Sequence, residues 1–164
     1  MFFVLDIGSR SVHIAGSTDQ PCEALMQQIA RNLTDRVDGF LKQTRYLIFD
    51  RDPLYAKALR TMLKDAGVEI VRRPSGSPNL NCFAERWMRS LRQECLSQII
   101  PLGENHLRQT ITSYVGHYHM ERNHQGLGYR LIESVVANSN ADEGRIRMRE
   151  RVGGLLNYYY RAAD

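Results

Sequence analysis

The sequence predicts an α/β domain built on a mixed β-sheet, and three observations carry this prediction. Short apolar runs typical of strands alternate along the chain with segments of helical periodicity. The first two of these runs are separated by a turn, which predicts an opening hairpin. Two later strands, over 45–50 and 68–71, flank a helical segment, as in a parallel β-α-β unit. The chain has 164 residues, enough for one domain with its own core.

The N-terminal third contains the opening hairpin and the first helix. Residues 2–5 and 12–16 are apolar and β-branched enough for strands, and the segment 8–11 between them is rich in Gly and Ser. Residues 21–34 follow, with apolar side chains at helical spacing. This segment is therefore predicted to form an amphipathic helix that packs on the hairpin.

The middle of the chain carries the predicted parallel unit. The run Arg45-Tyr46-Leu47-Ile48-Phe49 reads as a buried strand and ends on Asp50, and the helix after it ends at Gly67. The loop 74–79 contains Pro, Gly, Ser and Asn but no periodic signal. Two more helices are predicted, over 82–100 and 104–119.

The last part of the chain differs in composition from the rest. Residues 1–132 are assigned to one core domain, and residues 133–164 to a basic, aromatic C-terminal tail. In this tail Arg145, Arg147, Arg149 and Arg151 alternate at strand-like spacing, and three tyrosines follow at 158–160. These residues are interpreted either as contacts to DNA or as a solvated tail.

The charge balance permits a nucleic-acid partner. The chain has 22 basic and 18 acidic residues, for a net charge of +4, and its sequence pI is about 9.1. Only Lys42, Lys57 and Lys64 are lysines, and arginine pairs with phosphate oxygens bidentately. A GC-rich genome would produce the same arginine enrichment through codon bias. Composition alone therefore does not decide between codon bias and phosphate binding.

Composition and residue spacing disfavour membrane, secreted, disulfide-rich and zinc-binding proteins. No apolar run approaches the roughly 18 residues of a membrane span, and no secretory leader is visible, so a cytoplasmic location is expected. The three cysteines are scattered and odd in number, which argues against a disulfide framework. The spacing of His117, His119 and His124 matches no standard zinc site.

Two carboxylates stand at positions where a metal site can form. Asp50 ends an apolar strand, and ligands of open α/β sheets gather at the carboxyl ends of strands. Glu85 lies in the first turn of the helix predicted from 82. Converging carboxylates hold Mg²⁺ or Mn²⁺, and such ions serve phosphoryl transfer. Taken singly, Asp50 can equally be a turn residue and Glu85 an acid favoured by the helix dipole.

Four segments together resemble a known family. They are Asp50-Arg51-Asp52, residues 74–86 (PSGSPNLNCFAER), residues 91–96 (LRQECL) and residues 117–128 (HYHMERNHQGLG). In combination they resemble the integrase core of bacterial insertion-sequence transposases. These proteins are relatives of retroviral integrases and have a ribonuclease-H-like fold. The resemblance extends over roughly residues 2–132.

The resemblance implies a function and a set of site residues. Proteins of this family cut and join DNA strands at element ends and in target DNA, using an Asp, Asp, Glu triad with Mg²⁺ or Mn²⁺, and they work as multimers on DNA. Asp50 would be the second acid and Glu85 the third. Arg92 matches the family's basic residue after the glutamate, and Arg89 lies on the same helix face. Arg89 can also form a plain i,i+4 salt bridge with Glu85.

The chain departs from the family at its N-terminus. The family carries its first acid on the first strand of a three-stranded meander, whereas two strands are predicted here before the first helix. Asp6 follows the first of them and is interpreted as a turn residue that only resembles the first acid. The chain is therefore expected to be a truncated copy of the core, and whether this copy is active alone is left open. The alternative function is a non-catalytic fragment that binds DNA or poisons assemblies of longer copies.

Overall fold

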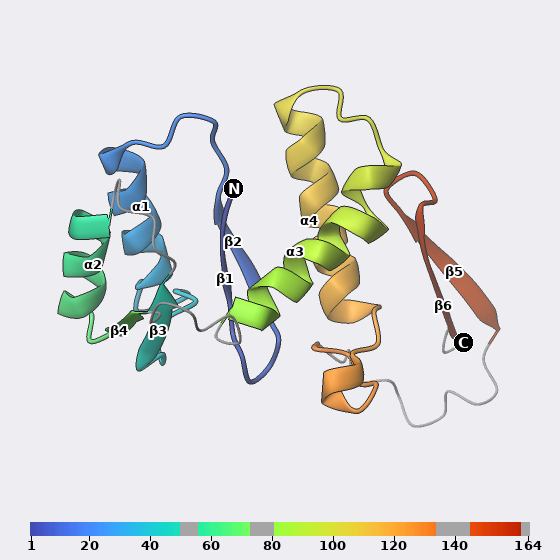
Figure 1. Ribbon diagram of the computed structural model, residues 1–164. Coiled ribbons are helices and arrows are strands. Elements are labelled where there is room, and N and C mark those ends of the chain that lie inside the picture. The colour runs from blue at the N-terminus through green and yellow to red at the C-terminus, as the bar shows by residue number, and fades with distance from the viewer. Residues whose placement is uncertain (50–55, 73–80, 134–144, 162–164) are drawn as a thin grey trace. The chain divides into compact units, whose positions relative to one another are not determined.

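The structure confirms the α/β class. It is a computed structural model that describes residues 1–49, 56–72, 81–133 and 145–161 (Figure 1). The described residues form α-helices, short 3-10 turns and small β-sheets. They fall into two compact units. Unit 1 comprises residues 1–5 and 12–83, and unit 2 comprises residues 6–11 and 84–164.

Unit 1 opens with the predicted hairpin. Strand β1 (Phe2–Leu5) pairs antiparallel with β2 (Val12–Gly16), and the register places Leu5 opposite Val12. Helix α1 (Glu23–Leu33) follows and buries one face, as its apolar spacing predicts. The hairpin and the helix are both confirmed.

The parallel unit is confirmed as well. Strand β3 (Tyr46–Phe49) pairs with β4 (Glu69–Arg72) in parallel, and helix α2 (Ala56–Asp65) lies between them in sequence. Gly67, which has a φ of +83°, ends the turn after α2. This left-handed conformation favours glycine, and it turns the chain back into β4.

The prediction of one mixed sheet is wrong for the described residues. They form three separate two-stranded sheets, β1–β2, β3–β4 and β5–β6. A continuous sheet needs neighbouring strands about 4.8 Å apart that share backbone hydrogen bonds. No described strand bridges the hairpin and the β3–β4 pair in this way, so the two pairs of unit 1 are joined through side chains instead.

The core of unit 1 supplies that connection. Its buried members come mainly from the two helices, and partly buried side chains of both strand pairs pack against them, including Phe2, Val4, Leu47 and Ile70. The buried positions are Met26, Ile29, Ala30, Leu33, Leu41, Leu59, Leu63 and Val68. One hydrophobic cluster therefore holds two small sheets that share no hydrogen-bond ladder.

Unit 2 is built on two helices, and one predicted boundary is wrong. Helix α3 (Cys82–Glu94) stops six residues before the predicted end at 100, and a 3-10 turn, η2 (Leu96–Gln98), replaces its last part. Cys95 between them has a φ of −134°, which is not helical. Pro101 further disfavours helical backbone at Ile100. Helix α4 (Glu104–Met120) then matches its prediction within one residue.

Aromatic side chains fill the core of unit 2. Trp87 of α3 is 1% exposed. The centre of its ring lies 4.6 Å from that of Tyr118 in α4, in an edge-to-face arrangement, and 5.4 Å from that of Tyr114. Leu91 and Cys95 are also buried. These contacts fix the inner face of α3 and leave its other face to solvent.

A C-terminal hairpin completes unit 2, and the sequence analysis does not predict it. Strand β5 (Ile146–Arg151) pairs antiparallel with β6 (Leu156–Arg161). The connecting turn has positive φ at Val152, Gly153 and Gly154, with values of 53°, 63° and 86°. Two consecutive glycines at such a turn are the signal that marks this hairpin in the sequence.

Two expectations from composition concern disulfide bonds and membrane-spanning helices. All three cysteines are free thiols, so they form no disulfide framework. No helix among the described residues is long and apolar enough to cross a membrane.

Candidate metal and nucleic-acid site

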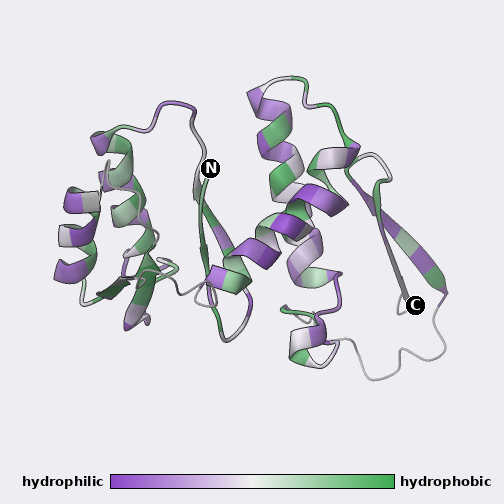
Figure 2. Ribbon diagram, viewed as in Figure 1, coloured by the Kyte–Doolittle hydropathy of each residue, from purple (hydrophilic) through white to green (hydrophobic). Residues whose placement is uncertain are grey.

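Helix α3 presents Glu85 to solvent. Glu85 lies in the first turn of the helix and is exposed, whereas Trp87 and Leu91 on the other face are buried. Figure 2 shows that hydrophilic residues predominate along this helix. The buried aromatic side chains thus hold the helix, and the carboxylate projects from the side that packing leaves free.

Two arginines share this exposed face. Arg89 and Arg92 stand four and seven residues after Glu85, which is about one and two helical turns, and both are exposed. Within the described ranges, Glu85 forms no ion pair with Arg89. The face therefore offers one carboxylate and two guanidinium groups to a ligand, in that order along the helix.

Asp50 and the loop 74–79 lie outside the described residues. Strand β3, which ends at Phe49, is the element that leads to Asp50, and it is paired along its whole length with β4. The described part of the proposed acid pair is therefore Glu85 alone.

Asp6 lies in the turn between β1 and β2 and is used locally. Its Oδ1 atom accepts hydrogen bonds from the Ser9 amide at 2.6 Å and from the Ser9 hydroxyl at 2.8 Å. The Ser9 amide is the main cause that holds the pKa of Asp6 below its ordinary value. Backbone bonds from Asp6 to Ser11 and from Arg10 to Asp6 close the same turn. Asp6 thus has the contacts of a turn-forming acid.

The donor chemistry of Glu85 fits a hard divalent cation. Carboxylate oxygens are the ligands that Mg²⁺ and Mn²⁺ prefer, and the carboxylate of Glu85 is exposed and unpaired within the described ranges. Among the described residues, no group of three or more acidic, histidine or cysteine side chains could hold a metal ion. Asp50, the second acid that the resemblance implies, lies outside the described residues.

The segment after α4 is held by buried and partly buried polar groups. Glu94 accepts a hydrogen bond from the Tyr114 hydroxyl at 2.7 Å and a two-pronged pair from Arg122 at 2.7 and 3.1 Å. His124 is 5% exposed, and its Nε2–H donates to the Tyr118 carbonyl at 2.7 Å. Burial lowers the pKa of His124. Its contacts are those of a packed histidine.

Glu121 is a buried acid that the sequence analysis misses. Its side chain is 1% exposed and accepts hydrogen bonds from two arginines of β5 and one histidine of α4. Arg151 donates through Nε and Nη2 at 2.8 to 3.0 Å, and Arg149 through Nη1 at 3.3 Å. His117 Nδ1 lies 3.0 Å from Oε2 of the same carboxylate. We name this group the Glu121 anchor, because it fastens the C-terminal hairpin to α4.

The residues around the Glu121 anchor leave room for the Arg151 guanidinium and keep the Glu121 carboxylate charged. A Cβ atom at Gly116 would lie 3.1 Å from Nη1 of Arg151, so the absence of a side chain gives the guanidinium its place on the helix. Burial by itself raises the pKa of Glu121, but the hydrogen bonds from Arg151, His117 and Arg149 outweigh it and hold the pKa below the ordinary value. Glu121 is therefore ionised at neutral pH.

Replacing Glu121 with Gln is expected to lower the free energy of unfolding by about 2 kcal/mol at pH 7, because it leaves two arginines without their counter-charge. The lowered pKa gives the sign of the pH dependence. The stabilisation is complete above pH 4.5, the ordinary pKa of glutamate, and is lost as the pH falls through the pKa of the folded state. Urea titrations between pH 7 and pH 3 measure this difference, which should shrink toward the acid end.

Glu104 provides the control for this prediction. It pairs with Arg108 on the same helix, but both side chains are exposed, at 64% and 47%. Glu104→Gln is therefore expected to cost no more than about 0.5 kcal/mol. An equal loss in both variants, or a Glu121→Gln difference that does not change with pH, contradicts the anchor.

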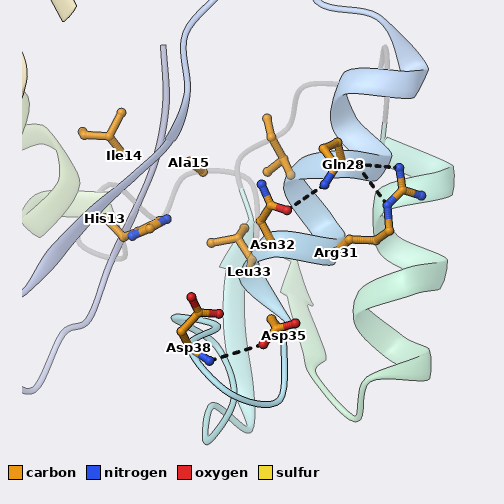
Figure 3. Close-up of a pocket in the computed structure, with 10 residues that line it drawn as sticks. His13, Ile14, Ala15, Gln28, Arg31, Asn32, Leu33, Asp35 and Asp38 are labelled. Atoms are coloured by element: carbon orange, nitrogen blue, oxygen red, sulfur yellow. Dashed lines mark hydrogen bonds between the residues drawn. The ribbon is translucent and has the colours of Figure 1, made fainter.

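A pocket in unit 1 contains none of the predicted site residues. It has a volume of about 500 Å³ and lies between β2 and α1 (Figure 3). Several of its polar groups bind one another, since Gln28 donates to Asn32 at 2.7 Å and accepts from Arg31 at 3.0 Å. The amide of Asp38 likewise donates to the carboxylate of Asp35. These groups are already satisfied without a ligand.

Comparison with known proteins connects the α3 face to a family. Residues 66–131 match the family model described as integrase core domain. This stretch contains Glu85, Arg89, Arg92 and Glu121, and it ends before the C-terminal hairpin. Neither the curated proteins nor the solved structures give a match. The part of the chain that carries the exposed acid and arginines of α3 is thus similar to the core domain of integrases and transposases.

Proposed function

We propose that this protein carries out metal-dependent cleavage and joining of DNA strands, as a transposase or integrase core. The observation that carries the proposal is the exposed face of α3. There Glu85 stands in line with Arg89 and Arg92, inside the segment that is similar to the integrase core domain. An acid followed by two cations on one helix face suits a metal ion beside a phosphodiester.

Asp50 and Glu85 are the proposed metal ligands, through their carboxylate oxygens. A bound Mg²⁺ or Mn²⁺ would lower the pKa of the attacking water or 3′ hydroxyl and stabilise the leaving oxygen. Arg92, with Arg89 beside it, is proposed to bind the phosphate groups on either side of the scissile bond. The packing of Trp87 against α4 keeps the helix that bears these groups rigid.

An assay of DNA cleavage and joining tests the proposal. The purified chain is incubated with labelled duplex DNA and Mg²⁺ or Mn²⁺, and products are resolved on a denaturing gel. We expect nicked or joined strands with either ion and none after EDTA treatment. Activity that survives EDTA contradicts the metal requirement.

A second candidate is a DNA-binding protein without catalysis, which could associate with longer copies and inactivate them. The observation in its favour is Asp6, whose carboxylate is engaged by Ser9 within the hairpin turn. DNA binding in EDTA, without cleavage in either metal ion, would favour this candidate. No DNA binding at low salt would contradict both.

A further inference from the structure

The C-terminal hairpin separates its side chains into two faces. Residues 145–161, which we name the basic ribbon, comprise β5, its turn, β6 and the preceding Arg145. The register places Arg147 opposite Tyr160, Arg149 opposite Tyr158 and Arg151 opposite Leu156. Because side chains alternate along a strand, the arginines and these partners share one face. The other face carries Ile146, Met148 and Tyr159, which are exposed. Figure 2 shows this alternation along β5.

The net charge of the whole chain is concentrated in this ribbon. Residues 145–161 contain five arginines and one acid, Glu150, which gives a net charge of +4. The full chain has 22 basic and 18 acidic residues, so the remainder has 17 of each and is neutral. The positive charge of this protein is therefore a property of one short element and not of its surface in general.

The ribbon is fastened to α4 at its turn end. At the turn end, Arg151 and Arg149 bind the buried Glu121 of α4, and Leu156 is buried. At the other end, Arg145 and Arg147 are exposed and have no ion-pair partner among the described residues. The rings of Tyr158 and Tyr160 stack at 5.9 Å, and the Arg149 guanidinium lies 5.2 Å from the centre of the Tyr160 ring. These contacts stiffen the strand pair beyond the anchor.

We propose that the basic ribbon is a binding arm for duplex DNA, in which Arg145 and Arg147 contact phosphates. A two-stranded antiparallel ribbon fits the major groove of B-form DNA. The Glu121 anchor fixes the arm to α4, and the family match at 66–131 ends before the arm begins. The arm is thus a second DNA contact, added to the segment that is similar to the integrase core. This inference rests on the proposed function for its partner, but binding through the arm requires neither metal nor cleavage.

A binding measurement in EDTA tests the arm apart from catalysis. The full chain and the double variant Arg145→Gln/Arg147→Gln are titrated with a fluorescent 30-base-pair duplex at several salt concentrations. Each phosphate contact adds about 0.9 to the slope of log affinity against log salt. We expect the slope to fall by about 2 and the affinity at 0.1 M salt to fall by tenfold or more. The variant Arg145→Lys/Arg147→Lys should retain most of the affinity, because it keeps the charge.

The control variant removes the same charge elsewhere. Arg36 and Lys57 are exposed residues of unit 1. Arg36→Gln/Lys57→Gln is expected to change the slope by less than about 0.5, because neither residue contacts a phosphate in this proposal. Equal losses in the two double variants would overturn the arm, since net charge alone would then explain binding. Circular dichroism of each variant confirms that the fold is intact.

Two further probes identify the partner. Double-stranded RNA has a deep, narrow major groove that does not admit a ribbon, so it should bind more weakly than DNA. Its affinity for the full chain and for the Arg145→Gln/Arg147→Gln variant should be nearly the same. Vesicles with anionic lipid replace DNA in a second titration, and tighter binding to them than to the duplex overturns the proposal. If the chain cleaves no DNA but the ribbon variant loses affinity in EDTA, the arm stands while the proposed reaction fails.

Discussion

Replacing Glu85 with Gln is expected to reduce metal-dependent DNA cleavage at least about a thousandfold, equivalent to roughly 4 kcal/mol of transition-state stabilisation. An amide keeps the size of the side chain but loses the negative charge that holds a divalent ion. Asp50→Asn should have the same effect for the same reason. Affinity for DNA, measured in EDTA, should be unchanged or higher in both variants, because each removes a negative charge. Rates from single-turnover cleavage at saturating Mg²⁺ provide the comparison.

Glu23 is the matched control for Glu85. Both are exposed acids in the first turn of a helix, Glu23 in α1 and Glu85 in α3. If Glu85 were only an acid favoured by the helix dipole, both substitutions would cost a few tenths of a kcal/mol in stability and leave cleavage intact. Unchanged cleavage by Glu85→Gln would therefore remove Glu85 from the site. A loss of cleavage in Glu23→Gln would show that the assay reports folding.

Replacing Trp87 with Ala is expected to have the largest effect on stability, about 3 to 5 kcal/mol. Trp87 is 1% exposed and its ring contacts Tyr114 and Tyr118, so its removal leaves a cavity between α3 and α4. Since the same helix carries Glu85, the variant should also lose cleavage at temperatures where the full chain is active. Urea unfolding followed by far-ultraviolet circular dichroism measures the loss, because Trp87 is the sole tryptophan and fluorescence disappears with it.

Tyr159 provides the contrast for Trp87. It is an aromatic residue of the same unit, but it is 65% exposed. Tyr159→Ala is expected to cost less than about 1 kcal/mol. A loss below about 1 kcal/mol in Trp87→Ala would mean that the helices of unit 2 are held by other contacts.

Local sequence signals predicted most of the elements. The hairpin of β1 and β2, helix α1 and the parallel pair of β3 and β4 follow from apolar periodicity and from turn residues, both of which act over a few neighbours. Glu85 was placed correctly in the first turn of α3 by the same reasoning. Whether it and Asp50 hold a metal ion stays a prediction.

The errors have one local cause, at the end of α3, and otherwise arise where distant residues decide the structure. Helix α3 was extended to 100 because its apolar spacing continues, while non-helical backbone at Cys95 ends it at Glu94. The single sheet was wrong because sheet continuity depends on strand neighbours that periodicity does not specify. The role of Glu121 is not predictable from its neighbours, because its partners, Arg149 and Arg151, are about 30 residues away in sequence. A buried ion pair of this kind has no local signature.

The division of the strands into pairs has a consequence for handling the protein. In a two-stranded sheet every strand is an edge, so each described strand has one side without a backbone partner in its own sheet. Strands β1 and β3 consist of Phe2-Phe3-Val4-Leu5 and Tyr46-Leu47-Ile48-Phe49, which contain no charge and no proline. Such segments add readily to strands of other molecules. Aggregation that increases with protein concentration is therefore the expected failure of this chain during purification, and a lysine introduced at exposed Tyr46 should reduce it.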